Sequence, residues 1–253
     1  NDSEVKIISV PRLVLSLITF SFVVYLVPGM FGAPLKALSG YLPPITSIDF
    51  GLPEIIRQNA ATYSGQSDVG NICDKPKYSD DLRLPHGLKG YFDFQQGLAC
   101  AKKLEKPVFI DFTGHGCVNC REMESNVWAN PEVLKRLKND YIIISLYVDD
   151  KKELDESLWY TSDKIHFATK YNLPKAIESP NYDDKVKKTI GKQNANLQII
   201  MFNNNAQPYY LLLDHDGKKL AEPKAYDKEW KNFVEFLDEG KKAFENNHLL
   251  SSL

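Results

Sequence analysis

The sequence has little cysteine and little excess charge of either sign. Four cysteines in 253 residues are too few for a scaffold held together by disulfide bonds. The formal net charge of −2 at pH 7 leaves no basic footprint for nucleic acid, so we expect no such partner. The length suffices for one or two domains with a hydrophobic core. Because the chain begins with Asn1 rather than Met, we expect it to have been processed or cut from a longer protein.

A full set of zinc ligands is also lacking. One Cys-x-x-Cys pair is present, Cys117 and Cys120, and both zinc sites and redox sites use this spacing. A zinc site needs two further ligands, but Cys73, Cys100 and the five histidines form no second Cys-x-x-Cys and no His-x-x-x-His. We therefore expect no bound metal and favour redox chemistry, with a zinc-binding module as the lesser alternative.

The cysteine pair lies in the most informative stretch of the chain, residues 106–128. This stretch predicts a buried strand at 108–112, a small-residue turn at 114–116 and a helix that opens at Cys117. Free backbone N–H groups and the dipole at a helix start favour the thiolate, which is the reactive form of cysteine. We expect Cys117 to be the attacking thiolate and Cys120, one turn along, to be the resolving thiol.

The rest of the second half alternates between helical and strand patterns. The predicted elements are helix 92–104, strand 108–112, the helix from 117, a helix that starts at 130–131, strand 141–148, an irregular insertion at 149–181, helix 185–202, a hairpin of strands 209–213 and 218–221, and helix 227–244. A right-handed crossover makes strands 108–112 and 141–148 parallel neighbours, and the Asp-Gly turn of the hairpin adds antiparallel strands. This order predicts an α/β fold with a mixed central sheet and flanking helices.

The N-terminal part is of a different kind. Residues 13–27 are apolar apart from Ser and Thr, and with their flanks they reach the length of a membrane span. Lys6 and Arg12 before the span place the N-terminus on the cytoplasmic side. An export signal and a buried soluble helix are the alternatives. We therefore expect a transmembrane segment at 1–32, an extracytoplasmic linker rich in Pro at 33–84, and the α/β domain at 85–253.

Five residues carry a resemblance to a known family: Asp111 six positions before Cys117, the pair Cys117 and Cys120, Glu124 four positions after Cys120, and Pro208. The segment resembles the active site of thioredoxin-fold proteins. It resembles more closely the C-terminal periplasmic domain of the DsbD family, bacterial thiol:disulfide interchange proteins. The resemblance covers residues 90–244, and the apolar N-terminal segment is similar to the end of that family's membrane domain. One departure is the Gly-His-Gly before Cys117, where thioredoxins usually carry a Trp; it bears on groove shape and thiol potential.

The resemblance implies a thioredoxin-like fold and gives roles to three residues besides the cysteines. Asp111 is placed behind Cys120 as proton acceptor for the resolving thiol, and a buried carboxylate there also raises the thiol pKa; the alternative is an edge-strand residue that points to solvent. Glu124 shares the helix face of Cys120, or is simply a solvated helix residue. Pro208 is expected in a cis bond after Gln207, beside backbone that offers strand-like hydrogen bonds to a partner.

Other residues leave alternatives open. His115 stabilises the thiolate when protonated, or is an exposed turn residue without that role. Cys73 and Cys100 form a structural disulfide, or else Cys100 is a buried thiol and Cys73 a free one. The aromatic residues at 91, 92 and 94 are expected in the core rather than in a ligand site.

These features together predict a membrane-tethered protein-disulfide reductase. By resemblance, the pair Cys117 and Cys120 takes electrons from cysteines of an upstream membrane domain and passes them to extracytoplasmic thiol-disulfide proteins. The domain then faces the periplasm from the bacterial inner membrane. No cofactor is needed, because the electrons travel as dithiols. A disulfide oxidase or isomerase and a non-catalytic binding module are the alternatives.

Overall fold

The chain divides into two compact units, Asn1–Asp68 and Val69–Leu253. The computed structural model describes residues 9–31, 33, 35, 37–38, 40–42, 56, 72–173 and 177–251, with the backbone alone for 248–251. Much of the linker expected at 33–84 therefore lies outside the described residues. The expected boundary between residues 84 and 85 lies inside the second unit, because Leu82 and Leu84 are buried in its core.

The first unit contains the helix α1, Val10–Met30. Pro11 occupies its first turn, where the missing N–H of proline costs no helical hydrogen bond. The helix is 21 residues long, with a mean hydropathy of 2.1 over its most apolar window and none of that window buried. By length and composition α1 is able to cross a membrane, as expected for residues 13–27.

The second unit is an α/β domain. Its elements in chain order are η2 (Pro85–Gly87), α3 (Phe94–Leu104), β1 (Val108–Thr113), α4 (Val118–Met123), the π-helical η3 (Glu124–Trp128), α5 (Pro131–Asp140), β2 (Ile142–Tyr147), η4 (Glu156–Leu158), β3 (Tyr160–Thr161), α6 (Lys164–Lys170), β4 (Val186–Lys187), α7 (Ile190–Phe202), β5 (Tyr209–Leu213) and α8 (Trp230–Ser251). Asp, Asn and Thr, which are favoured at helix N-termini, cap four of the helices: Asp93, Asn130, Asp163 and Thr189.

The central sheet has the strand order β2-β1-β5. Strand β1 pairs in parallel with β2, with Asp111 opposite Ser145. It pairs antiparallel with β5, with Asp111 opposite Tyr210. The predicted mixed sheet is therefore confirmed, and β1 is its central strand. The edge-strand alternative for Asp111 is wrong.

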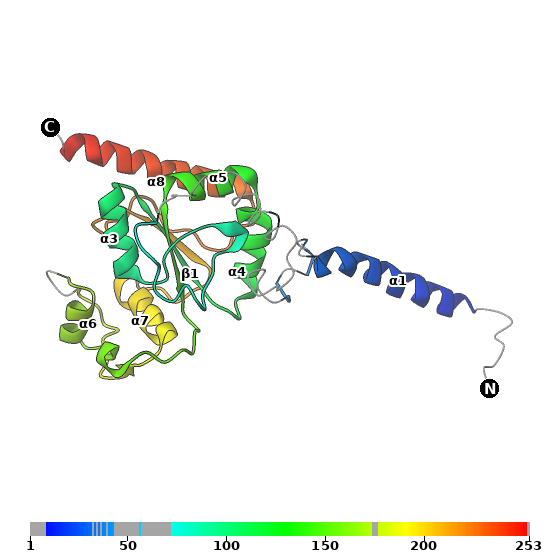
Figure 1. The fold of residues 1–253 in the computed structure, drawn as a ribbon, viewed down its shortest axis with the longest axis horizontal. Helices are drawn as coiled ribbons and strands as arrows, with labels where there is room; N and C mark the ends of the chain where they lie inside the picture. The colour runs from blue at the N-terminus through cyan, green and yellow to red at the C-terminus, as the bar shows by residue number, and fades with distance from the viewer. Residues whose placement is uncertain are drawn as a thin grey trace. The chain divides into compact units, whose positions relative to one another are not determined.

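The two faces of this sheet carry separate hydrophobic layers, because alternate residues of a strand point to opposite faces. Phe109 packs with the η3, α5 and α8 side chains, and α5 and α8 lie side by side (Figure 1). Val108, Ile110 and Phe112 pack with α3 and α7 on the other face. Asp111 has the parity of Phe109, so its side chain points to the face that carries α4 and η3.

Two predicted segments differ from the structure. Residues 149–181, predicted to be irregular, contain η4, β3 and α6. Residues 185–189, predicted to be helical, contain the strand β4, which pairs with β3, and the capping residue Thr189. The strand pairing joins residues 25 positions apart, with Thr161 opposite Val186, so no local periodicity signals it.

The hairpin prediction is confirmed only in its first half. Strand β5 is present, and the turn after it closes with Gly217 at a φ of 87°, which glycine adopts without a Cβ clash. Residues 218–221 form no regular strand; they contribute an isolated bridge between Lys219 and Leu213. A second bridge joins Tyr210 to Lys224, so the returning chain follows the sheet edge irregularly.

Candidate functional site

The cysteine pair lies at the junction of the turn after β1 and the start of α4. Cys117 is the residue that caps α4, and its Sγ accepts a hydrogen bond from the backbone N–H of Cys120 at 3.1 Å. The two residues form a disulfide, with their Cα atoms 5.2 Å apart. Cys117 is half-buried, whereas Cys120 is only 1% exposed. A protein partner can therefore reach Cys117 and not Cys120.

The turn that precedes Cys117 is held by the start of the insertion. The carboxylate of Asp149 accepts hydrogen bonds from the N–H groups of His115 at 2.8 Å and Gly116 at 2.9 Å. A Cβ at Gly114 would lie 2.9 Å from an Asp149 oxygen, so a side chain there collides with this contact. The imidazole Nε2 of His115 lies 2.8 Å from Asp150 Oδ2, and its ring packs on Tyr147. The turn is thus fixed by two consecutive aspartates that follow β2.

Asp111 is buried in the central strand β1, two positions before the strand ends, with 3% of its surface exposed. The Ser145 hydroxyl, its neighbour on β2, donates a hydrogen bond to Oδ2 at 3.0 Å. Burial raises the pKa of Asp111 to about 7, while the Ser145 hydrogen bond and the Arg121 charge lower it. This carboxyl group therefore gains and loses its proton near neutral pH, which suits a proton acceptor for a thiol.

Glu124 begins the π-helical turn η3 and is also buried, with 5% exposed. The alternative of a solvated helix residue is therefore wrong. Its Oε1 lies 2.8 Å from Nη2 of Arg121, which is itself 4% exposed. Burial raises the pKa of Glu124 to about 8; the Arg121 charge opposes this and the Asp111 charge reinforces it.

Pro208 lies at the same end of the sheet as the turn before Cys117. The bond from Gln207 to Pro208 is cis, as expected, and Pro208 is buried. The antiparallel register pairs Tyr209 with Phe112, so Pro208 comes one position beyond this pair, level with the end of β1. The roles of Pro208, Asp111 and Glu124 in exchange stay predictions.

The other two cysteines form a second disulfide. Cys73 and Cys100 are joined, with Cα atoms 5.6 Å apart, so the structure favours the structural disulfide over two separate thiols. Cys100 is 2% exposed, on α3. The aromatic residues Tyr91, Phe92 and Phe94 are buried, as expected for core residues.

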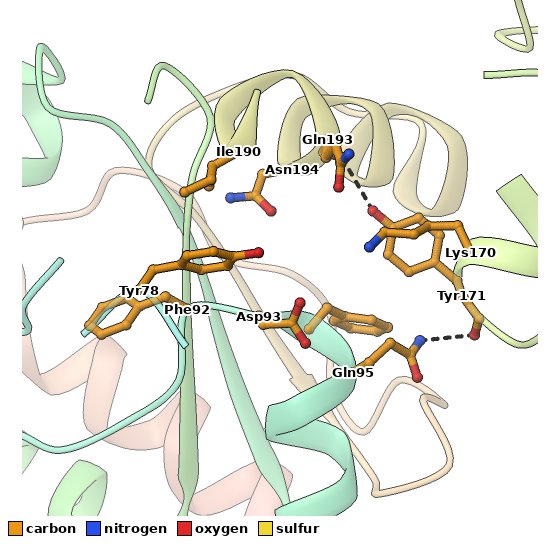
Figure 2. Close-up of a pocket in the computed structure, with 10 residues that line it drawn as sticks. Tyr78, Phe92, Asp93, Gln95, Lys170, Tyr171, Ile190, Gln193 and Asn194 are labelled. Carbon is orange, nitrogen blue, oxygen red and sulfur yellow. Dashed lines mark hydrogen bonds between the residues drawn. The ribbon is translucent and has the colours of Figure 1, made fainter. Parts of the chain in front are cut away.

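A small cavity lies elsewhere in the domain, where α3, α6 and α7 meet (Figure 2). Its volume of about 20 Å³ holds about one water molecule. Lys170, Asp93 and Gln193 line it, and Tyr171 beside them accepts a hydrogen bond from Gln95 through its carbonyl oxygen at 2.8 Å (Figure 2). Neither the reactive cysteines nor the buried charged groups line this cavity, so it plays no part in the site described above.

Sequence reasoning missed three residues that shape the site: Arg121, Ser145 and Asp149. The i,i+3 spacing of Arg121 and Glu124 is a local signal for an ion pair, although nothing local shows that it is buried. Ser145 and Asp149 act on residues 33 to 34 positions away. Only the pairing of β1 with β2 brings them there.

Comparison with protein families gives a match over most of the domain. The thioredoxin-like domain family matches residues 94–239, more than half of the chain. The described elements over these residues, a mixed sheet with helices on both faces, have the thioredoxin-like arrangement that the sequence predicts.

Relatives among known proteins match a shorter segment. The thiol:disulfide interchange proteins DsbD of two Vibrio vulnificus strains, CMCP6 and YJ016, are 39% identical over 51 residues. The match covers 20% of this chain and 9% and 8% of those two proteins, so the chain spans less than a tenth of their length. A solved structure titled DsbH oxidoreductase aligns with a TM-score of 0.41 at 14% identity, covering 64% of this chain and 91% of that one.

Proposed function

The chain belongs to the thioredoxin-like domain family, and we propose that it is a membrane-tethered protein-disulfide reductase that exchanges electrons through Cys117 and Cys120. In this proposal an upstream set of membrane-domain cysteines reduces the pair, and the pair reduces extracytoplasmic thiol-disulfide proteins. The similarity of a 51-residue segment to DsbD supports thiol-protein partners in general. The direction of electron flow rests on the chemistry of the site.

The observation that carries the proposal is an accessible cysteine next to a buried one at the start of α4, with two buried carboxyl groups on the adjoining elements β1 and η3. A strong oxidase has a reduced form that is stabilised, usually by a low-pKa thiolate. The carboxyl groups of Asp111 and Glu124 act in the opposite sense when they are ionised, because a negative charge nearby raises a thiol pKa. A less stable thiolate makes the reduced pair a stronger electron donor. The site therefore favours transfer of electrons from the Cys117–Cys120 dithiol to substrate disulfides.

The exchange proceeds in two balanced steps. The Cys117 thiolate attacks one sulfur of the partner disulfide; the partner's S–S bond breaks, a partner thiolate leaves, and a mixed disulfide forms. The Cys120 thiol then gives its proton to the Asp111 carboxylate and attacks the Cys117 sulfur. The Cys117–Cys120 disulfide forms as the mixed disulfide breaks, so the partner has gained the electron pair that the dithiol has lost.

Helix α1 supplies the tether in this proposal. Its 21 residues, with an apolar surface and Arg12 near its start, match a single span, and Lys6 and Arg12 favour a cytoplasmic N-terminus. A test is alkylation of the reduced chain in intact spheroplasts with a membrane-impermeant maleimide. Labelling of Cys117 in intact spheroplasts, and retention of the chain in carbonate-washed membranes, support the tether and its orientation. Labelling only after lysis contradicts the orientation.

The decisive test of function is the reduction potential of the pair, measured by equilibrating the full chain in detergent micelles with glutathione. A value between about −270 and −220 mV is expected for a reductase of this kind. A value near −120 mV identifies an oxidase and reverses the proposed electron flow. If Cys117→Ser removes exchange with a disulfide substrate but leaves partner capture intact, the pair is catalytic; if exchange persists, the domain is a binding module.

A further inference from the structure

The buried charges of the domain gather in one place. Among the residues that the structure describes, three charged side chains are buried, namely Asp111, Arg121 and Glu124. They influence one another electrostatically, and Arg121 directly follows Cys120. Removing charges from water is costly, and a buried ion pair is often no more stabilising than apolar residues of the same size. Stability alone therefore gives no reason for this cluster beside the cysteines.

Arg121 connects the segments on both sides of Cys117. Its Nη2 donates to Thr113 Oγ1 at 3.0 Å and to the Gly114 carbonyl oxygen at 3.3 Å, where β1 ends. The same nitrogen lies 2.8 Å from Glu124 Oε1, where η3 begins. Its buried Nε has no hydrogen-bond partner among the described residues. The contacts of Nη2 therefore fix the side chain in a position that leaves Nε without a described partner. We expect this of a group whose role is to position its neighbours.

We propose that Arg121 is a positioning residue for the resolving step, the attack of Cys120 on the Cys117 sulfur; this inference rests on the proposed function. Its guanidinium holds Glu124 to the end of β1. Its contact with Thr113, which has the parity of Asp111 on β1, places a positive charge on the face of the strand that carries the Asp111 carboxyl group. That charge favours the ionised carboxylate, the form that accepts the Cys120 proton. The reaction is the one written above; Arg121 neither gains nor loses a bond or a proton in it.

Charged and titratable groups act on Asp111 from four elements: α4, η3, β2 and β5. Tyr147 on β2 and Tyr210 on β5 are buried, and burial raises the pKa of both hydroxyl groups, so they stay neutral near pH 7. An imidazole nitrogen of His86 lies 2.7 Å from the Glu124 carbonyl oxygen. Among the described side chains that act on the pKa of Asp111, Arg121 is the cation, and its charge lowers that pKa.

The test uses the full chain in detergent micelles, with Cys117 and Cys120 reduced and the Cys73–Cys100 disulfide intact. It is mixed with one equivalent of dithiobis(nitrobenzoate), a small aromatic disulfide with a coloured thiolate product. The first equivalent of colour reports the attack by Cys117, and the second reports resolution by Cys120. The rate of the second phase is measured against pH. For Arg121→Met, whose side chain is similar in length but uncharged, we expect the pH midpoint of this phase to rise by about one unit, which makes it about fivefold slower at pH 7.

Three further variants separate charge from mere structure. Arg121→Lys keeps the charge and is expected to restore most of the midpoint. Arg136→Met removes an arginine that pairs with Asp238 and Glu132 on the surface, and is expected to leave both phases unchanged. Should Arg121→Met not fold, Glu124→Gln and the double variant Glu124→Gln with Arg121→Met give the same comparison without an unpaired carboxylate at position 124.

The outcomes are distinct. A midpoint about one unit higher in Arg121→Met than in wild type, or in the double variant than in Glu124→Gln, supports the inference. Equal midpoints within either pair overturn it, even if the rates differ, because a purely structural role changes rates without moving the midpoint. If the wild type itself releases no second equivalent, the proposed function fails as well; if it does and the midpoints are equal, only the role of Arg121 fails.

Discussion

The substitution Asp111→Asn makes the stability of the domain less dependent on pH. The folded-state pKa of Asp111 is raised by burial to about 7, from a usual value of 3.8. A raised pKa means that the folded protein holds this proton more tightly than the unfolded chain does. The stabilisation from the protonated carboxyl group is therefore fully present below about pH 3.8 and is lost as the pH rises through about 7.

The size of the effect follows from the same two values. A difference of about 3 pKa units, at about 1.4 kcal/mol per unit, corresponds to about 4 kcal/mol. Asparagine has no proton to lose and still accepts the Ser145 hydrogen bond. Between pH 4 and pH 8 we expect the free energy of unfolding of the wild type to fall by about 4 kcal/mol relative to Asp111→Asn.

The assay is urea unfolding of the oxidised full chain at a series of pH values, followed by tryptophan fluorescence. Asp216→Asn serves as the control, because Asp216 is 57% exposed and pairs with Lys102 on the surface; its curve should run parallel to the wild type. Parallel curves for Asp111→Asn as well would refute the burial argument. The same variant is expected to slow the resolving phase at pH 7 by about 100-fold, the lower range for loss of a general base.

Three other predictions concern single contacts. Cys120→Ser is expected to trap a mixed disulfide on Cys117, detected as one added equivalent by mass spectrometry; prompt release of the partner argues against the assigned resolving role. Replacing Cys73 and Cys100 by alanine opens a loop of 27 residues and should lower the free energy of unfolding by about 3 kcal/mol with no change in the first exchange phase. Asp149→Ala removes the acceptor of two exposed N–H groups, which water then solvates, and should lower the free energy of unfolding by about 0.5–1.5 kcal/mol; an unchanged unfolding midpoint contradicts this.

Local sequence determined the parts of this protein that depend on neighbouring residues. The apolar run that forms α1, the strand at 108–112, the helix opening after Cys117 and the Asn130-Pro131 helix start all follow from spacing, capping and turn chemistry within a few positions. The redox pair is visible for the same reason, because its two thiols lie within one helical turn. The parallel pairing of β1 with β2 followed from the order of these elements and the handedness of crossovers.

Tertiary structure decided what lies around the thiols. The register of β1 with β2 places Ser145 on Asp111 and carries Asp149 to the turn before Cys117, and no local pattern encodes a contact across more than 30 residues. The burial of Arg121 and Glu124 likewise depends on packing from outside their helix. A charged helix residue is normally solvated, so sequence alone predicts that both side chains lie on the surface. Only the packing of the folded domain buries them as an ion pair close to the cysteines in the chain.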